Sequence, residues 1–232
     1  MSLLKKIVKA FFAILMGCVI AVAAYYGIYV SMEMPSVEEI QDLSSVSDDL
    51  PFLQQRAIKK SRQSAVRILS MTEGGVIANA SGTYFTVKGK HYVLTVMHGL
   101  VGACAQTRIW TREDGFTACR NVVVADITSD YAIIEIDEIP SLSPVEILHD
   151  LPKGISWKRA LATQTTTYYT GFPNNIIDPL TFTGKIIGYA EGDYIYIDSF
   201  AWSGSSGSGV FTADGKFIGY ILAVEVGQTD YG

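Results

Sequence analysis

From about residue 64 to the C-terminus, the chain consists of short stretches in which apolar and polar residues alternate, with turns between them. Alternation with a period of two is typical of strands that bury one face. The clearest stretches are 65–69, 81–87, 91–96, 122–125, 131–136, 165–169, 180–189, 193–197, 209–211 and 217–226. Because no long helical pattern separates them, we predict a mainly β fold, either an antiparallel barrel or a sandwich.

The strands fall into two successive sets. The first spans about 64–145 and the second about 160–232, and the stretch from about 139 to 160 between them contains three prolines and little pattern. A proline-containing stretch without periodicity is typical of a linker. We therefore predict one β domain over 64–232 that contains two barrels.

The N-terminal segment carries a different signal. Residues 10–30 are 21 consecutive residues without a charge, and three lysines precede them. As a helix this run measures about 31 Å, at roughly 1.5 Å per residue, which matches the hydrocarbon core of a bilayer. The preceding lysines place the N-terminus in the cytoplasm and the chain after Ser31 on the other side of the membrane. We predict an uncleaved, single-pass anchor within residues 1–34.

A cleavable signal peptide is the alternative, because Ala21-Val22-Ala23 resembles a cleavage site, and the protein would then be secreted. The apolar run continues past this site through several tyrosines of the kind found at membrane interfaces, which favours the anchor. Lipid modification at Cys18 is disfavoured, because the residues after it stay apolar. Apolar residues at helical spacing between 52 and 58 predict a helical stalk or linker over 35–63.

Charge and cysteine content argue against two classes of function, nucleic-acid binding and metal binding. The formal net charge is −5, and without the three lysines of the first 30 residues the rest of the chain carries 15 basic and 23 acidic residues, or −8. This acidity argues against a nucleic-acid binder. Cys104 and Cys119 either pair or remain buried thiols, and the sequence leaves both open. No Cys/His spacing indicates a metal site, and we expect no metal or other cofactor.

A loop over residues 201–211 contains three glycines and four serines. Such a loop is either a flexible turn or a place where glycine lets backbone N–H groups converge on one point. Converging N–H groups stabilise the oxyanion that a serine nucleophile creates. Ser206 has Gly204 two residues before it and Gly207 directly after it. It is therefore the candidate nucleophile, with the N–H groups of Gly204 and Ser206 as the oxyanion hole.

A serine nucleophile needs a base, and the chain has three histidines. His98 ends the apolar strand predicted over 91–96 and is followed by Gly99, so it emerges at the end of a buried strand. Rigid scaffolds present catalytic side chains at such positions. His91 and His149 are interpreted as exposed or edge residues. His98 is therefore the candidate base.

The acid that orients the histidine is also expected at the end of a strand. Asp130 leads directly into the strand over 131–136, where a carboxylate needs a partner such as an imidazole N–H. Asp126 is the fallback. The order His98, Asp130, Ser206 is that of chymotrypsin-like barrels, whereas α/β-hydrolases place the histidine after the serine.

The segments around these residues resemble the motifs of chymotrypsin/trypsin-like serine proteases, in the compact bacterial and viral branch that includes the HtrA and glutamyl-endopeptidase groups. The similar segments are 94–98 at the histidine, 130–134 at the aspartate, 204–211 at the serine, 81–85 before the histidine and 214–219 after the serine. The resemblance runs from about 64 to 226. Gly209 stands where the family usually has proline.

The resemblance implies two six-stranded antiparallel barrels and acyl transfer through His98, Asp130 and Ser206, on a protein or peptide substrate. It also implies that residues 220–224 pair with the substrate and that residues 199–202 wall the primary specificity pocket. The implied substrate-binding residues are Phe200, Ala201, Tyr220, Ile221, Leu222 and Ala223. Phe200 and Ala201 carry no charge, which favours an uncharged apolar side chain at the cleavage site.

The sequence therefore predicts a membrane-anchored serine endopeptidase. Two alternatives keep the fold and change the function. One is a catalytically silent module that binds or scaffolds a partner, and the other is an esterase that uses the same three residues. The presence of all three residues argues against the silent module.

Overall fold

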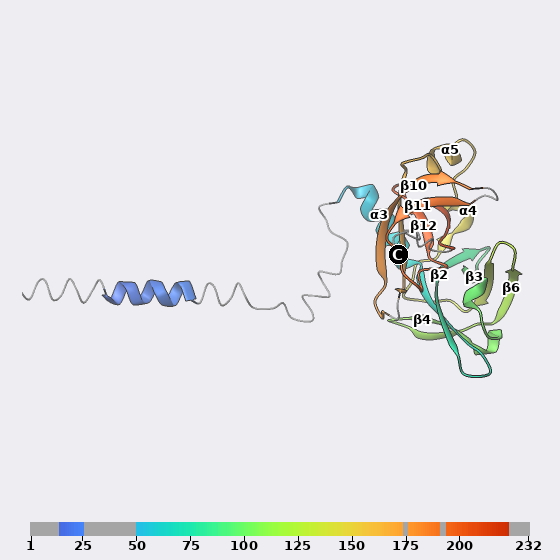
Figure 1. The fold of residues 1–232 in the computed structure, drawn as a ribbon, viewed down its shortest axis with the longest axis horizontal. Coiled ribbons are helices and arrows are strands. Elements are labelled where there is room, and N and C mark those ends of the chain that lie inside the picture. The colour runs from blue at the N-terminus through green and yellow to red at the C-terminus, as the bar shows by residue number, and fades with distance from the viewer. Residues whose placement is uncertain (1–13, 26–49, 174–175, 191–193, 223–232) are drawn as a thin grey trace, which may run out of the picture. The chain divides into compact units, whose positions relative to one another are not determined.

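The fold is described from a computed structural model, which places residues 14–25, 50–173, 176–190 and 194–222. The chain divides into two units, Met1–Val46 and Ser47–Gly232, and each is described by itself. In the first unit, residues 14–25 form a helix (Figure 1). Its side chains are exposed. No helix within the described ranges is long and apolar enough to cross a membrane. The remainder of the predicted anchor, and most of the segment that follows it, lie outside the described residues.

The first of two curled sheets in the second unit has eight strands and holds the largest hydrophobic core. Its strands are β1 (Ala65–Met71), β2 (Ile77–Val87), β3 (Lys90–Val96), β4 (Thr107–Thr111), β5 (Gly115–Ala118), β6 (Asn121–Asp126), β7 (Tyr131–Ile136) and β8 (Val145–Glu146). They follow the order β5-β4-β1-β2-β3-β7-β6 with antiparallel neighbours, and β8 pairs with β2 in parallel. Alternate side chains point inward, and those of Val66, Ile68, Tyr84, Val93 and Ile134 are fully buried.

The second sheet has five antiparallel strands. They are β9 (Thr166–Gly171), β10 (Leu180–Tyr189), β11 (Ile195–Ser199), β12 (Gly209–Thr212) and β13 (Phe217–Tyr220), in the order β11-β10-β9-β12-β13. The prediction of a mainly β fold with two curled antiparallel sheets is confirmed (Figure 1). The count of six strands in each barrel is not confirmed, because the described residues give eight strands in one sheet and five in the other.

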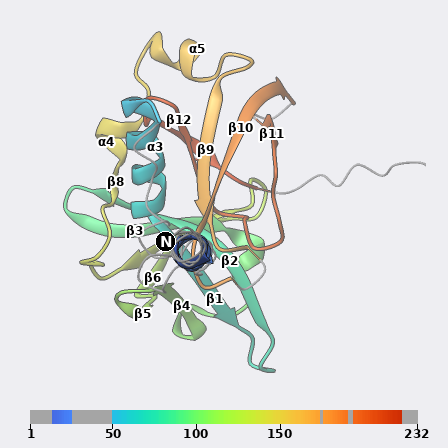
Figure 2. The same cartoon turned by 90° about the vertical axis from the view of Figure 1, so that its left-hand side faces the viewer.

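Helix α3 (Phe52–Gln63) lies against the second sheet, beside β9 and β12 (Figure 2). Ala57 is completely buried there, and the Ser61 hydroxyl donates a hydrogen bond to Thr170 Oγ1 at 2.8 Å. Arg62 donates hydrogen bonds to Pro179 O and Thr181 Oγ1, both at 3.1 Å. The helical pattern that the sequence places in a stalk is thus packed on the β domain, and the packed part begins upstream of residue 64.

The segment between the two sheets contains more structure than a linker. Besides β8, it forms two short helices, α4 (Ile147–Asp150) and α5 (Ser156–Ala160). Asp150 on α4 is buried and forms an ion pair with Lys60 of α3. The Glu146 N–H donates to the same carboxylate at 3.0 Å. This carboxylate therefore ties the connection between the sheets to the first helix of the domain.

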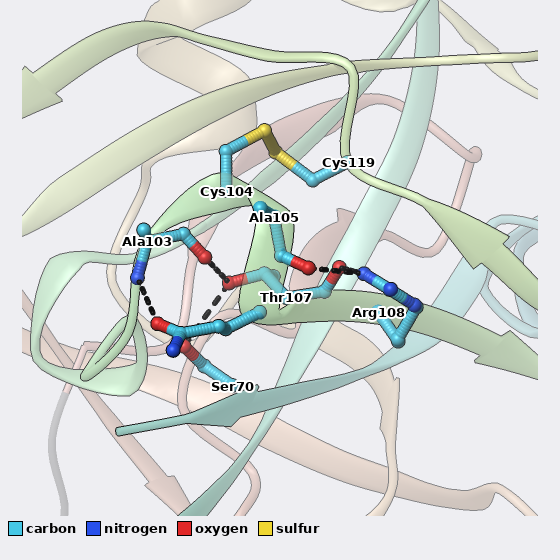
Figure 3. Close-up of a disulfide and its surroundings, with 8 residues drawn as sticks. Ser70, Ala103, Cys104, Ala105, Thr107, Arg108 and Cys119 are labelled. Atoms are coloured by element: carbon cyan, nitrogen blue, oxygen red, sulfur yellow. Dashed lines mark hydrogen bonds between the residues drawn. A yellow bond between two sulfur atoms is a disulfide. The ribbon is translucent and has the colours of Figure 1, made fainter. Parts of the chain in front are cut away.

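Cys104 and Cys119 form a disulfide with their Cα atoms 5.3 Å apart, which decides between the two alternatives that the sequence leaves open (Figure 3). The bridge joins the segment before β4 to the end of β5. Beside it, Thr107 Oγ1 donates to Ala103 O at 3.1 Å and lies 3.1 Å from Ser70 Oγ of β1. The disulfide therefore closes a segment that hydrogen bonds also hold on the first sheet.

Candidate active site

His98 lies directly after β3, in a single 3-10 turn formed by Met97–Gly99. Its side chain is 54% exposed, so the ring is accessible from solvent. Gly99 leaves no room for a side chain, because a Cβ there would lie 2.7 Å from the Cβ of Ala80. The turn that carries His98 therefore packs closely on β2.

Asp130 lies just before β7 and faces His98. Its φ is +50°, a conformation that aspartate tolerates better than most residues. Asp130 Oδ1 accepts a hydrogen bond from the backbone N–H of His98 at 2.8 Å, and Oδ2 lies 2.5 Å from His98 Nδ1. A carboxylate only accepts, so Nδ1 carries the hydrogen and Nε2 of the neutral ring is left as a proton acceptor. The pair therefore has the arrangement that a general base requires.

The serines of the loop over 201–211 differ in exposure. Ser205 and Ser208 are fully buried, and the Ser205 hydroxyl lies 3.4 Å from the N–H of Trp202, which donates to it. Ser203 is exposed at the start of the loop, and Ser206 is half-buried. Of the three serines that follow Gly204, Ser206 is therefore the one whose hydroxyl a substrate can approach.

Backbone hydrogen bonds in this loop follow a consistent pattern. The N–H groups of Ser205, Gly207 and Ser208 each donate to a backbone carbonyl, at 2.7 to 3.1 Å. The N–H groups of Gly204 and Ser206 have no acceptor among the residues that the structure describes. Gly204 and Gly207 have φ values of +94° and +91°, which only glycine adopts easily. Two N–H groups in the loop are thus available to an external acceptor.

Several contacts bring this loop to the end of the first sheet where His98 emerges. The Ser206 carbonyl accepts from the N–H of Ser81 on β2 at 2.8 Å, and the Ser81 carbonyl accepts from Thr95 Oγ1 on β3 at 2.7 Å. Thr95 precedes His98 by three residues. Within the described part of the chain, no hydrogen bond joins His98 to Ser206 directly.

Tyr220 connects the other side of the loop to the aspartate. Its hydroxyl donates to Ser129 O at 2.8 Å, directly before Asp130. Burial, followed by the nearby charge of Asp130, raises the pKa of Tyr220 to about 12, so the phenol stays protonated and remains a donor at neutral pH. The next residue, Ile221, accepts from Gly207 N–H at 2.7 Å and donates to Ser208 O at 2.8 Å. Tyr220, the last residue of β13, and Ile221 directly after it thus connect the segment before Asp130 to the serine loop.

The predicted pocket wall contains a cluster of aromatic rings. Phe200 and Trp202 lie edge to face with centroids 4.9 Å apart, and Phe182 of β10 stacks on Tyr169 of β9 at 4.9 Å. The Tyr169 hydroxyl donates to Phe200 O, and burial raises its pKa to about 12. Phe200 is 62% exposed, and Ala201 between the two exposed rings is half-buried.

The predicted substrate-pairing segment lies on an edge of the second sheet. β13 is the last strand in the sheet order, with β12 on its one paired side. Tyr220, Ile221 and Leu222 are half-buried here, and Ala223 lies outside the described residues. Because Ile221 uses both backbone groups toward the serine loop, those of Tyr220 point to the other side of the strand, where the described residues provide no partner strand.

The remaining candidates have other partners. His91 Nδ1 lies 2.5 Å from the Tyr84 hydroxyl, and His149 Nδ1 lies 3.1 Å from Asp150 Oδ1. Asp126 Oδ1 accepts from the N–H groups of the turn after β6, so this fallback acid caps a turn instead of contacting His98. Where side chains are described, no three His, Cys, Asp or Glu residues gather as a metal site would require.

The sequence did not lead us to Ser81 and Thr95, two residues of the first sheet that support the serine loop. Ser81 and Thr95 are fully buried polar residues in apolar strands, and both bond toward the serine loop or each other. A buried hydroxyl usually has a hydrogen-bond partner. Small polar residues at inward positions of otherwise apolar strands were the signal available in the sequence, but Gly204, which the Ser81 hydroxyl contacts, lies 123 positions away.

Comparison with known proteins identifies the family to which the chain is similar. The model of the family described as "Trypsin-like peptidase domain" matches residues 80–219. No curated protein gives a significant match. Among solved structures, the chain is similar to a serine endoprotease from Yersinia pestis, with 19% sequence identity and a TM-score of 0.60. That match covers 76% of this chain and 60% of the other, so the chain spans less than two thirds of that protein's length.

The family match includes the segments that contain His98, Asp130 and Ser206, and the structural similarity extends the shared fold beyond them. The chain therefore belongs to the trypsin-like peptidase domain family, which confirms the enzyme class predicted from the sequence, a trypsin-like serine protease hydrolase.

Proposed function

We propose that the protein is a membrane-anchored serine endopeptidase in which Ser206 is the nucleophile, His98 the general base and Asp130 the orienting acid. The observation that carries the proposal is the double contact of Asp130 with His98, which leaves Nε2 as the proton acceptor. The accessibility of Ser206, between two buried serines, supports its choice as the nucleophile.

The reaction proceeds in two proton-balanced halves. The Ser206 hydroxyl proton passes to His98 Nε2 while Oγ bonds to the peptide carbonyl carbon, and the carbonyl electrons move onto oxygen. When the intermediate collapses, the C–N bond breaks and the amine takes the proton from Nε2, which leaves an acyl-enzyme. Water then gives a proton to Nε2 and attacks the ester, and Ser206 Oγ leaves with that proton. Asp130 holds the ring and stabilises the imidazolium throughout.

The oxyanion of both intermediates is held by the N–H groups of Gly204 and Ser206. These groups have no acceptor in the described part of the loop, which supports this role. A donor of this kind typically lowers the barrier by about 3 kcal/mol, because it is already aimed where charge develops.

The substrate binds as an extended strand along residues 220–224, which begin at the end of β13. Its side chain at the cleavage site is uncharged and apolar, and it contacts the wall around Phe200 and Ala201. The exposed rings of Phe200 and Trp202 support this preference, because they offer apolar area beside the serine loop.

The charge pattern of the N-terminus supports the location. Residues 10–30 anchor the protein, with the N-terminus in the cytoplasm and the protease domain, at 64–232, on the other side. Alkaline carbonate extraction of membranes, with added protease on intact cells, tests this. An anchored protein stays in the pellet, and its domain is digested from outside. Release into the soluble fraction with a shortened N-terminus supports the secreted alternative instead.

A fluorophosphonate probe on the full-length chain tests the nucleophile. We expect the wild type to become labelled and Ser206→Ala to stay unlabelled, while Ser208→Ala, a matched change two residues away, keeps the label. Labelling that survives Ser206→Ala contradicts the assignment. A folded wild type that is never labelled supports the silent binding module. Hydrolysis of simple esters without cleavage of any peptide in a library supports the esterase.

A further inference from the structure

Ser81 of β2 has all its polar groups engaged at the junction of the two sheets. It is fully buried. Its hydroxyl donates to Gly204 O at 2.7 Å and accepts from the N–H of Phe172 at 2.8 Å. Its backbone N–H donates to Ser206 O at 2.8 Å. One residue of the first sheet therefore holds the carbonyl groups of both proposed oxyanion donors.

These two contacts hold the 204–205 and 206–207 peptide planes, which adjoin the planes that carry the Gly204 and Ser206 N–H groups. The carbonyl groups of Gly204 and Ser206 are both bound on the side of Ser81, whereas their N–H groups have no acceptor among the described residues. A glycine at φ +94° has many alternative conformations, because it lacks the Cβ that would exclude them. Oxyanion donors work only if they are oriented before the reaction. The loop therefore depends on an outside contact to stay in one orientation.

The packing around Ser81 shows how closely the loop is fitted to it. A Cβ on Gly207 would lie 2.0 Å from Ser81 O, and one on Gly171 would lie 2.7 Å from Ser81 Oγ. Glycine at these two positions lets the backbone of the second sheet reach the serine. The backbone at Gly171 thus lies close to the Ser81 hydroxyl, and the backbone at Gly207 lies close to the Ser81 carbonyl.

We propose that Ser81 is a positioning residue whose hydroxyl holds the Gly204 carbonyl, and thereby keeps the N–H groups of Gly204 and Ser206 oriented for the oxyanion. The inference rests on the proposed function, because it gives Ser81 a role in the same reaction. Ser81 contacts neither substrate nor reacting atoms. Its effect is therefore confined to steps in which negative charge develops on the carbonyl oxygen.

The test is Ser81→Ala in the full-length chain, beside Ser70→Ala as the matched control. Ser70 is also a fully buried serine of the first sheet, and its hydroxyl contacts Gly102 N–H at 2.9 Å and Thr107 Oγ1 at 3.1 Å. Both variants lose two buried contacts, and thermal unfolding of each reports that shared structural cost. Only Ser81 bonds to the serine loop.

We expect Ser81→Ala to lower kcat by about tenfold with KM nearly unchanged, since the lost contact matters in the transition state. A peptide boronate, whose tetrahedral adduct places an oxygen in the hole, should lose affinity by a similar factor. A reduced-amide peptide, which has no carbonyl at that point, should bind as it does to the wild type. Ser70→Ala should keep wild-type values in all three measurements.

Equal kcat and boronate affinity in Ser81→Ala and the wild type overturn the inference and leave the proposed function standing. An equal loss of kcat and of boronate affinity in Ser70→Ala also overturns the inference, because the effect then follows from removing any buried serine hydroxyl of the first sheet. A folded wild type that the fluorophosphonate does not label contradicts the proposed function and this inference together. If Ser81→Ala does not fold, Ser81→Cys replaces it, because the thiol keeps the shape and donates more weakly. It should then lower kcat and boronate affinity in the same direction.

Discussion

Asp130 binds His98 at two points, the backbone N–H through Oδ1 at 2.8 Å and Nδ1 through Oδ2 at 2.5 Å. The first contact fixes the turn that carries the histidine, and the second fixes the ring on that turn. The Met97 N–H adds a third contact, to the Asp130 carbonyl at 3.2 Å. The aspartate thus positions the base through both main chain and side chain.

Asp130→Asn should therefore damage catalysis more than folding. The amide keeps the size of the side chain, but it allows the imidazole to bind in the tautomer that has no acceptor at Nε2. We expect kcat to fall by about 10³- to 10⁴-fold. Asp126→Asn is the control, since asparagine also caps the turn that Asp126 holds. Steady-state kinetics on both variants decide, and comparable activity in the two contradicts the role of Asp130.

Phe200 offers a direct test of the preference at the cleavage site. Because the ring is 62% exposed, replacing it costs little folding energy. Phe200→Asp should raise the preference for lysine or arginine over leucine or phenylalanine by about tenfold in kcat/KM, since a charge is added to the wall. Phe200→Asn has the same shape without the charge and should show no such change. Identical peptide-library profiles for the two variants place Phe200 outside the pocket.

The ion pair of Lys60 and Asp150 makes stability depend on acid. Burial acts to raise the pKa of Asp150, but hydrogen bonds from Lys60, His149 and the Glu146 N–H outweigh it and hold the pKa below its usual value. The folded state then binds this proton less tightly than the unfolded state. The contribution is present above the ordinary carboxyl pKa and is lost as the pH falls below about 4.

Asp150→Asn should lower the free energy of unfolding by about 1–3 kcal/mol near neutral pH, with the difference from the wild type shrinking below about pH 4. Asp137→Asn is the control, because its pair with Arg120 is exposed on both sides and should contribute little. Urea unfolding across this pH range measures both. A difference for Asp150→Asn that is constant with pH contradicts the assignment to the ion pair.

The disulfide between Cys104 and Cys119 should be worth about 3 kcal/mol, given the 15-residue separation that it closes. Reduction, or the replacement of both cysteines by alanine, should lower the free energy of unfolding by this amount, which is measured as a lower urea midpoint. Cys18→Ala should have no effect, because that thiol is free. An unchanged midpoint under reducing conditions shows that the hydrogen bonds around Thr107 hold this segment without the bridge.

The sequence was sufficient for the fold class and for the residues at strand ends. His98, Asp130 and the serine loop each follow or precede a strand with clear alternation, and such local patterns survive in the structure. The hairpin of β4 and β5 was not predicted. Ile109 and Trp110 stand side by side in β4, so the alternation is interrupted there, and although Asp114-Gly115 marks the turn, both strands are short and partly exposed.

Contacts between residues that lie far apart in the sequence could not be predicted from local patterns. Nothing local distinguishes a stalk helix from α3, which is anchored through Ser61 and Lys60 to residues of the second sheet. Nothing local indicates that the Ser81 hydroxyl meets Gly204, 123 positions later. The pairing of the two cysteines was undecided for the same reason, since it depends on how the segment before β4 returns to the end of β5.

The docking of α3 also has a consequence for the time course of folding. The helix is made before any strand, yet Ser61 bonds to Thr170 and Lys60 bonds to Gly215, 109 and 155 positions downstream. Contacts of such high sequence separation form slowly, because a long chain must be closed before they are gained. During synthesis, α3 has no strand of the second sheet to pack on until β9 and then β12 have emerged from the ribosome, so the domain closes around this helix only after more than 100 further residues have been made.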